Sequence, residues 1–336
     1  MTACRFYALT DETTAARLES EIARLKPGGL FVLRAADLAA IVGPAPRAPL
    51  IGLSRKALAQ QMVAFQQCLE GLMPFGPVLP AAFQAHFADG AMAEAFLIGH
   101  EKRLAGALRD FGAKRQFQVT VSWTPEAMLR RLAQNPALAE TLSAKISASV
   151  SRGAAIQALM ETYRAELSRT FEALLRAASL DCMILPGLDA DAVVNATVLI
   201  EPERESLLDA AVKAIDAHAS EALRIRMAGP LPACAFASIR LDMPPAETIA
   251  RACRRLDVDR MALEPELKAA YHARMRASHP DVSPEGVAPD TEAKAAYELL
   301  AQLRAAELAV QSSGKRASGP IPTMQLLRAD MLSLVA

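Results

Sequence analysis

The order of strand-like and helix-like segments between residues 115 and 242 constrains the fold more than any other feature of this sequence. Four segments alternate or run apolar as strands do, and two longer stretches carry apolar residues at helical spacing. The strand-like segments are QFQVTVSW (116–123), LDCMILPG (180–187), DAVVNATVLIEP (191–202) and ALRIRMAGPLPACAFA (222–237). The helical stretches, 125–178 and 204–219, follow the first and third of them. This β-α-β-β-α-β order predicts an antiparallel sheet with helices on one face, the split βαβ or ferredoxin-like unit, with an enlarged first helical crossover.

The first 114 residues predict a separate α+β domain. CRFYALT (4–10) and LFVLRA (30–35) have the composition of strands, and a third, short strand is expected in APLIGL (48–53). Helical spacing is found in three stretches, 14–25, 55–72 and 81–111. The segment LMPFGPVLP (72–80) is interrupted by Pro and Gly, so we expect an ordered loop or short strand there.

Beyond residue 242 the pattern becomes all-helical. Helices are expected over 246–256, 265–278 and 291–310, followed by a Ser/Gly/Pro-rich flexible linker and a short amphipathic tail. The predicted fold class is therefore α+β with an all-α helical part. Four parts are expected: an N-terminal α+β domain (1–114), a ferredoxin-like domain (115–242), a helical domain (243–312), and the linker and tail (313–336).

Composition narrows the classes of function. Lys+Arg and Asp+Glu both number 37, so no net field favours nucleic acid. The five cysteines include no CxxC pair, which argues for reduced thiols and against a metal site. The N-terminus lacks a signal-peptide pattern, and the longest uncharged run, 71–88, is broken by three prolines. We therefore expect a cytoplasmic protein that inserts into no membrane.

Enzyme motifs are missing from the sequence. It contains no phosphate-binding G-x-x-x-x-G-K-[ST], no G-x-G-x-x-G, no H-E-x-x-H and no G-x-S-x-G. No pattern places a nucleophile, a base and an orienting group together. We expect a protein that is not an enzyme and needs no cofactor or metal.

The tripeptide His279-Pro280-Asp281 is the most distinctive short motif. The helical stretch before it carries a basic stripe, Lys268, His272 and Arg276, at i, i+4, i+8 spacing. Pro280 ends that helix, and an apolar stripe on each of the last two helices predicts an antiparallel hairpin with the tripeptide at its turn. The alternative is that the tripeptide only marks a helix end.

This region, about 246–310, resembles the J-domain of the DnaJ co-chaperones. The resemblance is carried by Leu256, Leu267-Lys268, Ala270-Tyr271, His279-Pro280-Asp281 and Ala296-Tyr297. It departs from the family pattern at His272, usually Arg, at Val282, usually Lys, and in lacking the basic cluster of the loop. The resemblance implies that the tripeptide and the basic stripe bind a DnaK-type chaperone and stimulate its ATPase.

Residues from 1 to about 240 resemble the gas-vesicle accessory proteins of the GvpF/GvpL family. The matching stretches, in order, are CRFYALT, LMPFGPV, VVNATVLIEPERESLLDAAV and RIRMAGPLPACAFA. The last carries the signature Gly-Pro-x-Pro-x-x-x-Phe at Gly229, Pro230, Pro232 and Phe236, but lacks the Tyr usual in the family. The resemblance implies two α+β domains, the second ferredoxin-like, and a structural or assembly role.

The resemblance also implies partners. We expect association with the small, apolar gas-vesicle shell protein and with other gas-vesicle accessory proteins, in the cytoplasm and at the gas vesicle. The four signature residues are the candidate shell-protein site, by offering a sheet edge. The alternative is that they only end the last strand. The alternative function is that of a general J-domain co-chaperone whose N-terminal region binds unrelated clients.

Overall fold

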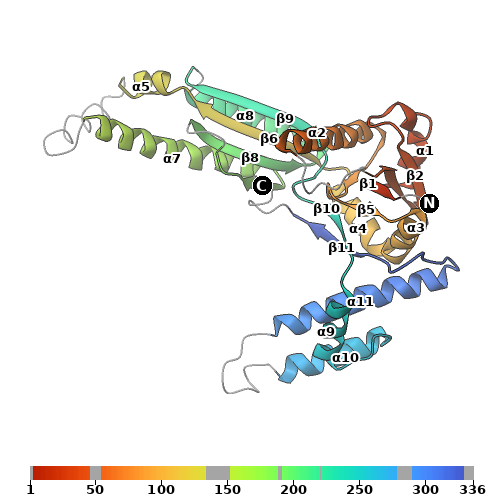
Figure 1. Ribbon diagram of the computed structural model, residues 1–336. Coiled ribbons are helices and arrows are strands. Elements are labelled where there is room, and N and C mark those ends of the chain that lie inside the picture. The colour runs from red at the N-terminus through yellow and green to blue at the C-terminus, as the bar shows by residue number, and fades with distance from the viewer. Residues whose placement is uncertain are drawn as a thin grey trace. The chain divides into compact units, whose positions relative to one another are not determined.

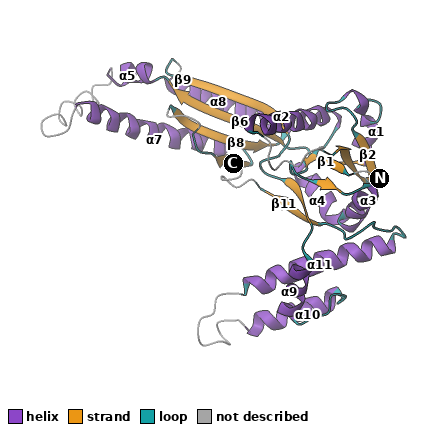
Figure 2. Cartoon of the chain, viewed as in Figure 1, coloured by secondary structure: helices purple, strands orange, loops and turns teal. Residues whose placement is uncertain are grey.

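The computed structural model describes residues 3–45, 54–133, 152–187, 191–219, 221–277 and 290–328. It divides into two compact units (Figures 1 and 2). The first combines Met1–Gly112 with Ala237–Leu327, and the second combines Ala113–Phe236 with Arg328–Ala336. This differs from the four consecutive parts expected, because the chain leaves the first unit, builds the second, and returns to the first.

The first unit is built on a sheet around β1 (Cys4–Asp11). β1 pairs antiparallel with β3 (Leu38–Pro44), which pairs with β2 (Phe31–Ala35), and the short strands β4 (Leu79–Pro80) and β5 (His86–Phe87) also pair with β1. The sequence analysis missed β3, since its run LAAIVGP lacks the polar alternation that identifies a half-exposed strand. The third strand expected at 48–53 lies outside the described residues.

Four helices surround this sheet. They are α1 (Glu12–Leu18), α2 (Arg55–Leu72), α3 (Gly90–Gly99) and α4 (Glu101–Phe111). Side chains of Asp11, Ser54 and Asp89 cap the first three by accepting a hydrogen bond from a backbone N–H. One continuous helix over 81–111 was wrong, because β5 precedes the Asp89 cap and His100 interrupts the helix between α3 and α4.

The second unit has the predicted strand order. Its sheet, β7-β8-β6-β9, is antiparallel throughout and comprises β6 (Arg115–Trp123), β7 (Asp181–Ile184), β8 (Ala192–Ile200) and β9 (Leu223–Leu231). The helices are α5 (Pro125–Ala133), α7 (Arg152–Ala178) and α8 (Glu205–Ala219). Alternate β6 residues, including Phe117 and Val121, join Phe171 of α7 and Ile215 of α8 in one core. The two helices therefore cover one face of the sheet, as expected for a split βαβ unit.

Three helices in the C-terminal part of the first unit match the expected positions closely: α9 (Ala246–Leu256), α10 (Glu264–Ala277) and α11 (Thr291–Ser312). α10 and α11 run antiparallel, since Arg274 lies 3.5 Å from Asp290 and Tyr271 stacks on Tyr297 with ring centroids 4.9 Å apart. Leu267 and Leu300 are buried in their shared core. The helical hairpin is thus present, and its kinship to a J-domain stays a prediction.

Two strands, one before and one after these helices in the sequence, were missed by the sequence analysis. β10 (Ser238–Asp242) pairs antiparallel with β11 (Thr323–Leu327), from Asp242 opposite Thr323 to Ser238 opposite Leu327. The segment expected to be a linker and tail therefore contributes a strand, and Met324 is buried beside Ile239 in the core of the first unit. Residues 329–336 of the expected tail lie outside the described residues.

The C-terminal helices are also bound to the N-terminal part of their unit. α11 packs on α3 so closely that a Cβ added at Gly99 would lie 2.8 Å from the Cβ of Ala306. The ring of His100 is buried and its Nε2 is 2.7 Å from the carbonyl oxygen of Pro322, just before β11. These contacts join helix α11 and strand β11 to the N-terminal α+β fold.

Candidate functional site

The signature residues of the last predicted strand lie around the exposed edge of the sheet in the second unit. β9 is one of the two edge strands of this sheet, β7 being the other, and among the described strands β9 pairs only with β6. Gln116 is opposite Leu231 and Gln118 is opposite Ala228, so Gly229 and Pro230 together face the single residue between them. This is a β-bulge, which bends an edge strand and limits indiscriminate pairing.

The bulge requires glycine at position 229. Gly229 has φ +144°, and a Cβ there would lie 2.6 Å from the ring of Phe117 and 2.9 Å from the carbonyl oxygen of Gln116. Any residue with a Cβ at this position would displace the backbone of β6. Gly229 and Pro230 are exposed at the edge and available to a partner.

Pro232 and Phe236, the other two signature residues, are buried. The segment that contains them is held against β6, because the side-chain oxygen of Gln116 accepts a hydrogen bond of 2.8 Å from the backbone N–H of Ala235. Phe236 also lies beneath the guanidinium of Arg328, 5.9 Å from the ring centroid. The structure therefore separates the signature into an exposed half at the bulge and a packed half that supports it.

Exposed residues of β9 add to the edge beside the bulge. Arg224, Arg226 and Met227 are exposed, and Met227 shows 43% of its surface. Charged side chains on an edge strand discourage pairing between copies. The sequence analysis missed these residues, although the alternation Leu-Arg-Ile-Arg was a visible signal of a strand with one polar face.

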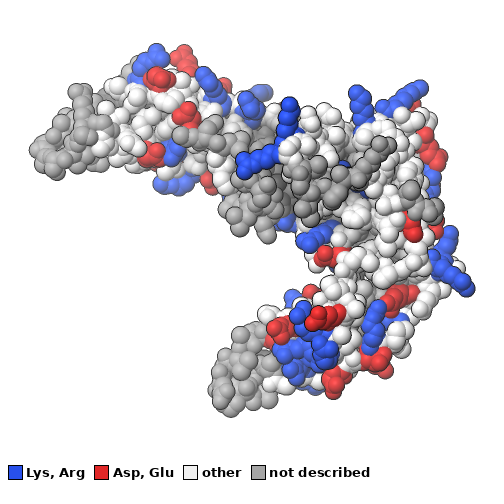
Figure 3. Space-filling view, in the orientation of Figure 1, with Lys and Arg blue, Asp and Glu red and all other residues white. Residues whose placement is uncertain are grey.

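The basic stripe predicted on α10 is present. Lys268, His272 and Arg276 are all exposed on that helix, whereas Arg274 of the same helix faces Asp290 of α11. His279, Pro280 and Asp281 lie outside the described residues. In the face shown in Figure 3, acidic and basic side chains are interspersed over the α9–α11 region, without a field of one sign.

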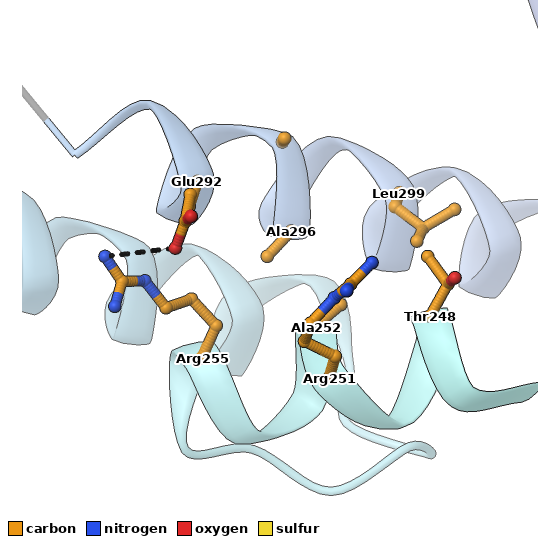
Figure 4. A pocket seen from close by; sticks show the side chains of 8 residues that line it. Thr248, Arg251, Ala252, Arg255, Glu292, Ala296 and Leu299 are labelled. Atoms are coloured by element: carbon orange, nitrogen blue, oxygen red, sulfur yellow. Dashed lines mark ion pairs between the residues drawn. The ribbon is translucent and has the colours of Figure 1, made fainter.

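A groove between α9 and α11 is the third feature, and the sequence analysis missed it. It has a volume of about 410 Å³ and is lined by Thr248, Arg251, Ala252, Arg255, Glu292, Ala295, Ala296 and Leu299. Thr248 and Arg251 point from α9 toward α11, and Ala252 and Ala296 form its floor (Figure 4). The i, i+4, i+7 spacing of Thr248, Ala252 and Arg255 was the sequence signal for such a face.

Charged side chains that pair with one another lie at one end of this groove. Arg255 donates to Asp290 at 2.7 Å and lies 3.6 Å from Glu292 (Figure 4). Partial burial acts to raise the pKa of Asp290, but hydrogen bonds from Arg255 and from the Ala293 N–H outweigh it and hold that pKa below its usual value. Asp290 therefore stays ionised, caps α11 and fixes Arg255 at the end of the groove.

Two further observations concern the described residues alone. Within them no cluster of three or more His, Cys, Asp or Glu side chains has an arrangement able to hold a metal ion. No helix among those described is both long and apolar enough to cross a bilayer.

Comparisons with known proteins identify the family. The model of the family described as "Gas vesicle synthesis protein GvpL/GvpF" matches residues 5–238. The crystal structure of the gas vesicle protein GvpF from Anabaena sp. PCC7120 is similar, with a TM-score of 0.52, 16% identity, and coverage of 70% of this chain and 97% of that one. GvpF from Microcystis aeruginosa gives a TM-score of 0.47 and 17% identity over 70% of this chain and 98% of its own. No curated protein matches the chain.

The likeness to the Anabaena structure shows a shared fold over 70% of this chain. The family match spans well over half of the sequence and ends where β10 begins. This chain therefore belongs to the gas vesicle synthesis protein GvpL/GvpF family.

Proposed function

We propose that this protein is a gas-vesicle assembly factor, not an enzyme, that binds the small hydrophobic shell protein and assists its nucleation or incorporation into the vesicle. The observation that carries the proposal is the family match over residues 5–238. An apolar shell protein that forms sheets needs a partner that occupies its unpaired strand before other copies do. Other gas-vesicle accessory proteins are the expected further partners.

The edge of β9 is the surface best suited to this role. Its outward backbone groups can accept an added strand, and exposed Met227 offers an apolar contact beside them. The bulge at Gly229-Pro230 and the cations Arg224 and Arg226 limit pairing between copies of this protein itself. The edge thus favours one added strand over open-ended aggregation.

Co-expression with the major gas-vesicle shell protein tests this proposal. We expect the shell protein to stay soluble, to co-elute with this protein, and to scatter less light than it does alone. Met227→Lys should weaken co-elution, because it places a charge in the apolar contact. Leu207→Lys is the matched control, since Leu207 is exposed to a similar extent, 46% against 43%, and lies on helix α8 and not on the edge strand. Aggregation of the shell protein in the presence of the wild-type protein would refute the proposal.

We further propose that the helical hairpin recruits a DnaK-type chaperone to the same client. The exposed basic stripe Lys268, His272 and Arg276 supports this idea. The test is the ATPase rate of a DnaK-type chaperone with the wild-type protein, with His279→Gln and with Lys268→Glu. Truncation is a poor test, because removal of β11 and α11 would uncover Ile239 and α3.

A stimulated ATPase that both substitutions reduce supports recruitment, and an unstimulated ATPase refutes it. The second candidate function, a general J-domain co-chaperone, makes the opposite pair of predictions from a pure assembly factor. It would stimulate the ATPase yet fail to keep the shell protein soluble. The two assays together therefore separate the alternatives.

A further inference from the structure

The groove between α9 and α11 lies on a side of the helical region that α10 does not occupy. α10 contributes Leu267 to the core shared with Leu256 of α9 and Leu300 of α11. None of the residues that line the groove comes from α10. α10 therefore packs on one side of the α9–α11 pair, and the groove lies on another side of the same pair.

The geometry of this groove suits a fourth helix. Thr248 lies near Leu299 at one end and Arg255 near Glu292 at the other, so α9 and α11 run antiparallel (Figure 4). Between these ends the groove is about 10 Å long, since each helix advances by seven residues, or two turns. Alanines at 252, 295 and 296 leave room for apolar side chains of an incoming helix. An apolar groove of this kind can hold the apolar face of an amphipathic helix.

The charge of the groove selects the kind of helix. Arg255 is already paired with Asp290 and Glu292. Arg251 points across the groove, is exposed, and forms no ion pair with any residue that the structure describes (Figure 4). The uncompensated charge in the groove is therefore positive and lies near its middle. A partner that places a carboxylate there gains an ion pair that α9 and α11 leave unmade.

We propose that the α9–α11 groove binds an acidic amphipathic helix of a protein partner, with its apolar side chains on Ala252 and Ala296 and a Glu or Asp against Arg251. The site is distinct from the basic stripe of α10, so the helical region can hold this partner while α10 is occupied.

Synthetic helical peptides and the full-length protein provide the test. The peptides are about four turns long, share one Leu/Ala face, and carry only Glu, only Gln or only Lys beside that face. Binding is measured by fluorescence anisotropy of the labelled peptide. Arg251→Glu is the test variant, and Arg254→Glu is its matched control, because Arg254 is exposed on the same helix but does not line the groove.

We expect the Glu peptide to bind the wild-type protein and to lose about fivefold to tenfold in affinity with Arg251→Glu, which removes one exposed ion pair and adds a repulsion. The Lys peptide should show the reverse preference, and Arg254→Glu should change neither affinity by more than about twofold. Ala295→Phe, which fills the groove from an exposed position, should abolish binding of the Glu peptide. No binding of any peptide, or equal losses with Arg251→Glu and Arg254→Glu, would overturn the proposal.

Discussion

The contact between α3 and α11 gives the sharpest prediction, Gly99→Ala. A Cβ at position 99 would lie 2.8 Å from the Cβ and 3.1 Å from the Cα of Ala306, closer than van der Waals contact allows. Separation of the helices would cost about 1–3 kcal/mol. Replacing a helical glycine with alanine otherwise gains about 0.5–1 kcal/mol. The net expectation is a protein less stable by about 0–2.5 kcal/mol.

Gly106→Ala is the matched control. Gly106 lies inside α4, and its nearest neighbour is the mobile end of Arg109, 3.8 Å from the added Cβ. Here only the helical gain applies, so this variant should be more stable by about 0.5–1 kcal/mol. The two alanine variants should thus differ from each other by about 1–3 kcal/mol, the cost of separating the helices, with Gly99→Ala the less stable.

Urea denaturation followed by far-UV circular dichroism measures both variants. Fluorescence of the single tryptophan, Trp123, reports on the second unit and should shift little if the two units unfold separately. Equal stability of Gly99→Ala and Gly106→Ala would contradict this prediction, because α11 would then not approach α3 as closely as described.

Two further predictions concern buried titratable groups. Burial lowers the pKa of His100 to about 4, from 6.5 in an unfolded chain, although its hydrogen bond to Pro322 acts in the other direction. As the pH falls, His100 is therefore protonated in the unfolded chain before it is protonated in the folded protein. The contribution of neutral His100 to the free energy of unfolding should be fully present above pH 6.5 and should fall by up to ~3 kcal/mol as the pH drops to 4. His100→Gln should flatten this loss in urea titrations, and an unchanged slope would contradict it. Burial also raises the pKa of Cys68 to about 12, so this thiol should react with a disulfide reagent only after unfolding, unlike half-buried Cys253. Equal rates for Cys68 and Cys253 in the native protein would contradict this expectation.

Local sequence patterns were sufficient to predict the elements that pack mainly against elements close to them in the sequence. The four strands and two helical crossovers of the second unit follow from alternation and helical spacing, and α2 and α9 begin and end at the expected residues. β3 escaped detection because both its faces are buried, which removes the polar alternation. Gly229-Pro230 was predicted as a site from the family signature, but its role as a bulge required the register of β6 and β9.

Long-range pairing explains the remaining errors. Thr323 bonds to Asp242 across 81 residues, and nothing in the Ser/Gly/Pro-rich segment before β11 indicates a strand that returns to the first unit. The α9–α11 groove likewise depends on which side of each helix α10 covers. Sequence spacing identifies an apolar stripe but does not say which of two candidate neighbours covers it.

The return of the chain changes what the helical region can do. A hairpin on a flexible tether would bring a chaperone into the vicinity of the client at an effective concentration set only by linker length. Here α9 to α11 are held at both ends, by β10 and β11, and α11 packs on α3 at Gly99. Partners bound at α10 or in the α9–α11 groove would therefore be held beside the N-terminal α+β fold in a limited set of orientations. If Gly99→Ala loosened this attachment, it should weaken the proposed joint action on the client while leaving the proposed ATPase stimulation by the hairpin itself unchanged. That combination would distinguish positioning by the fold from simple tethering.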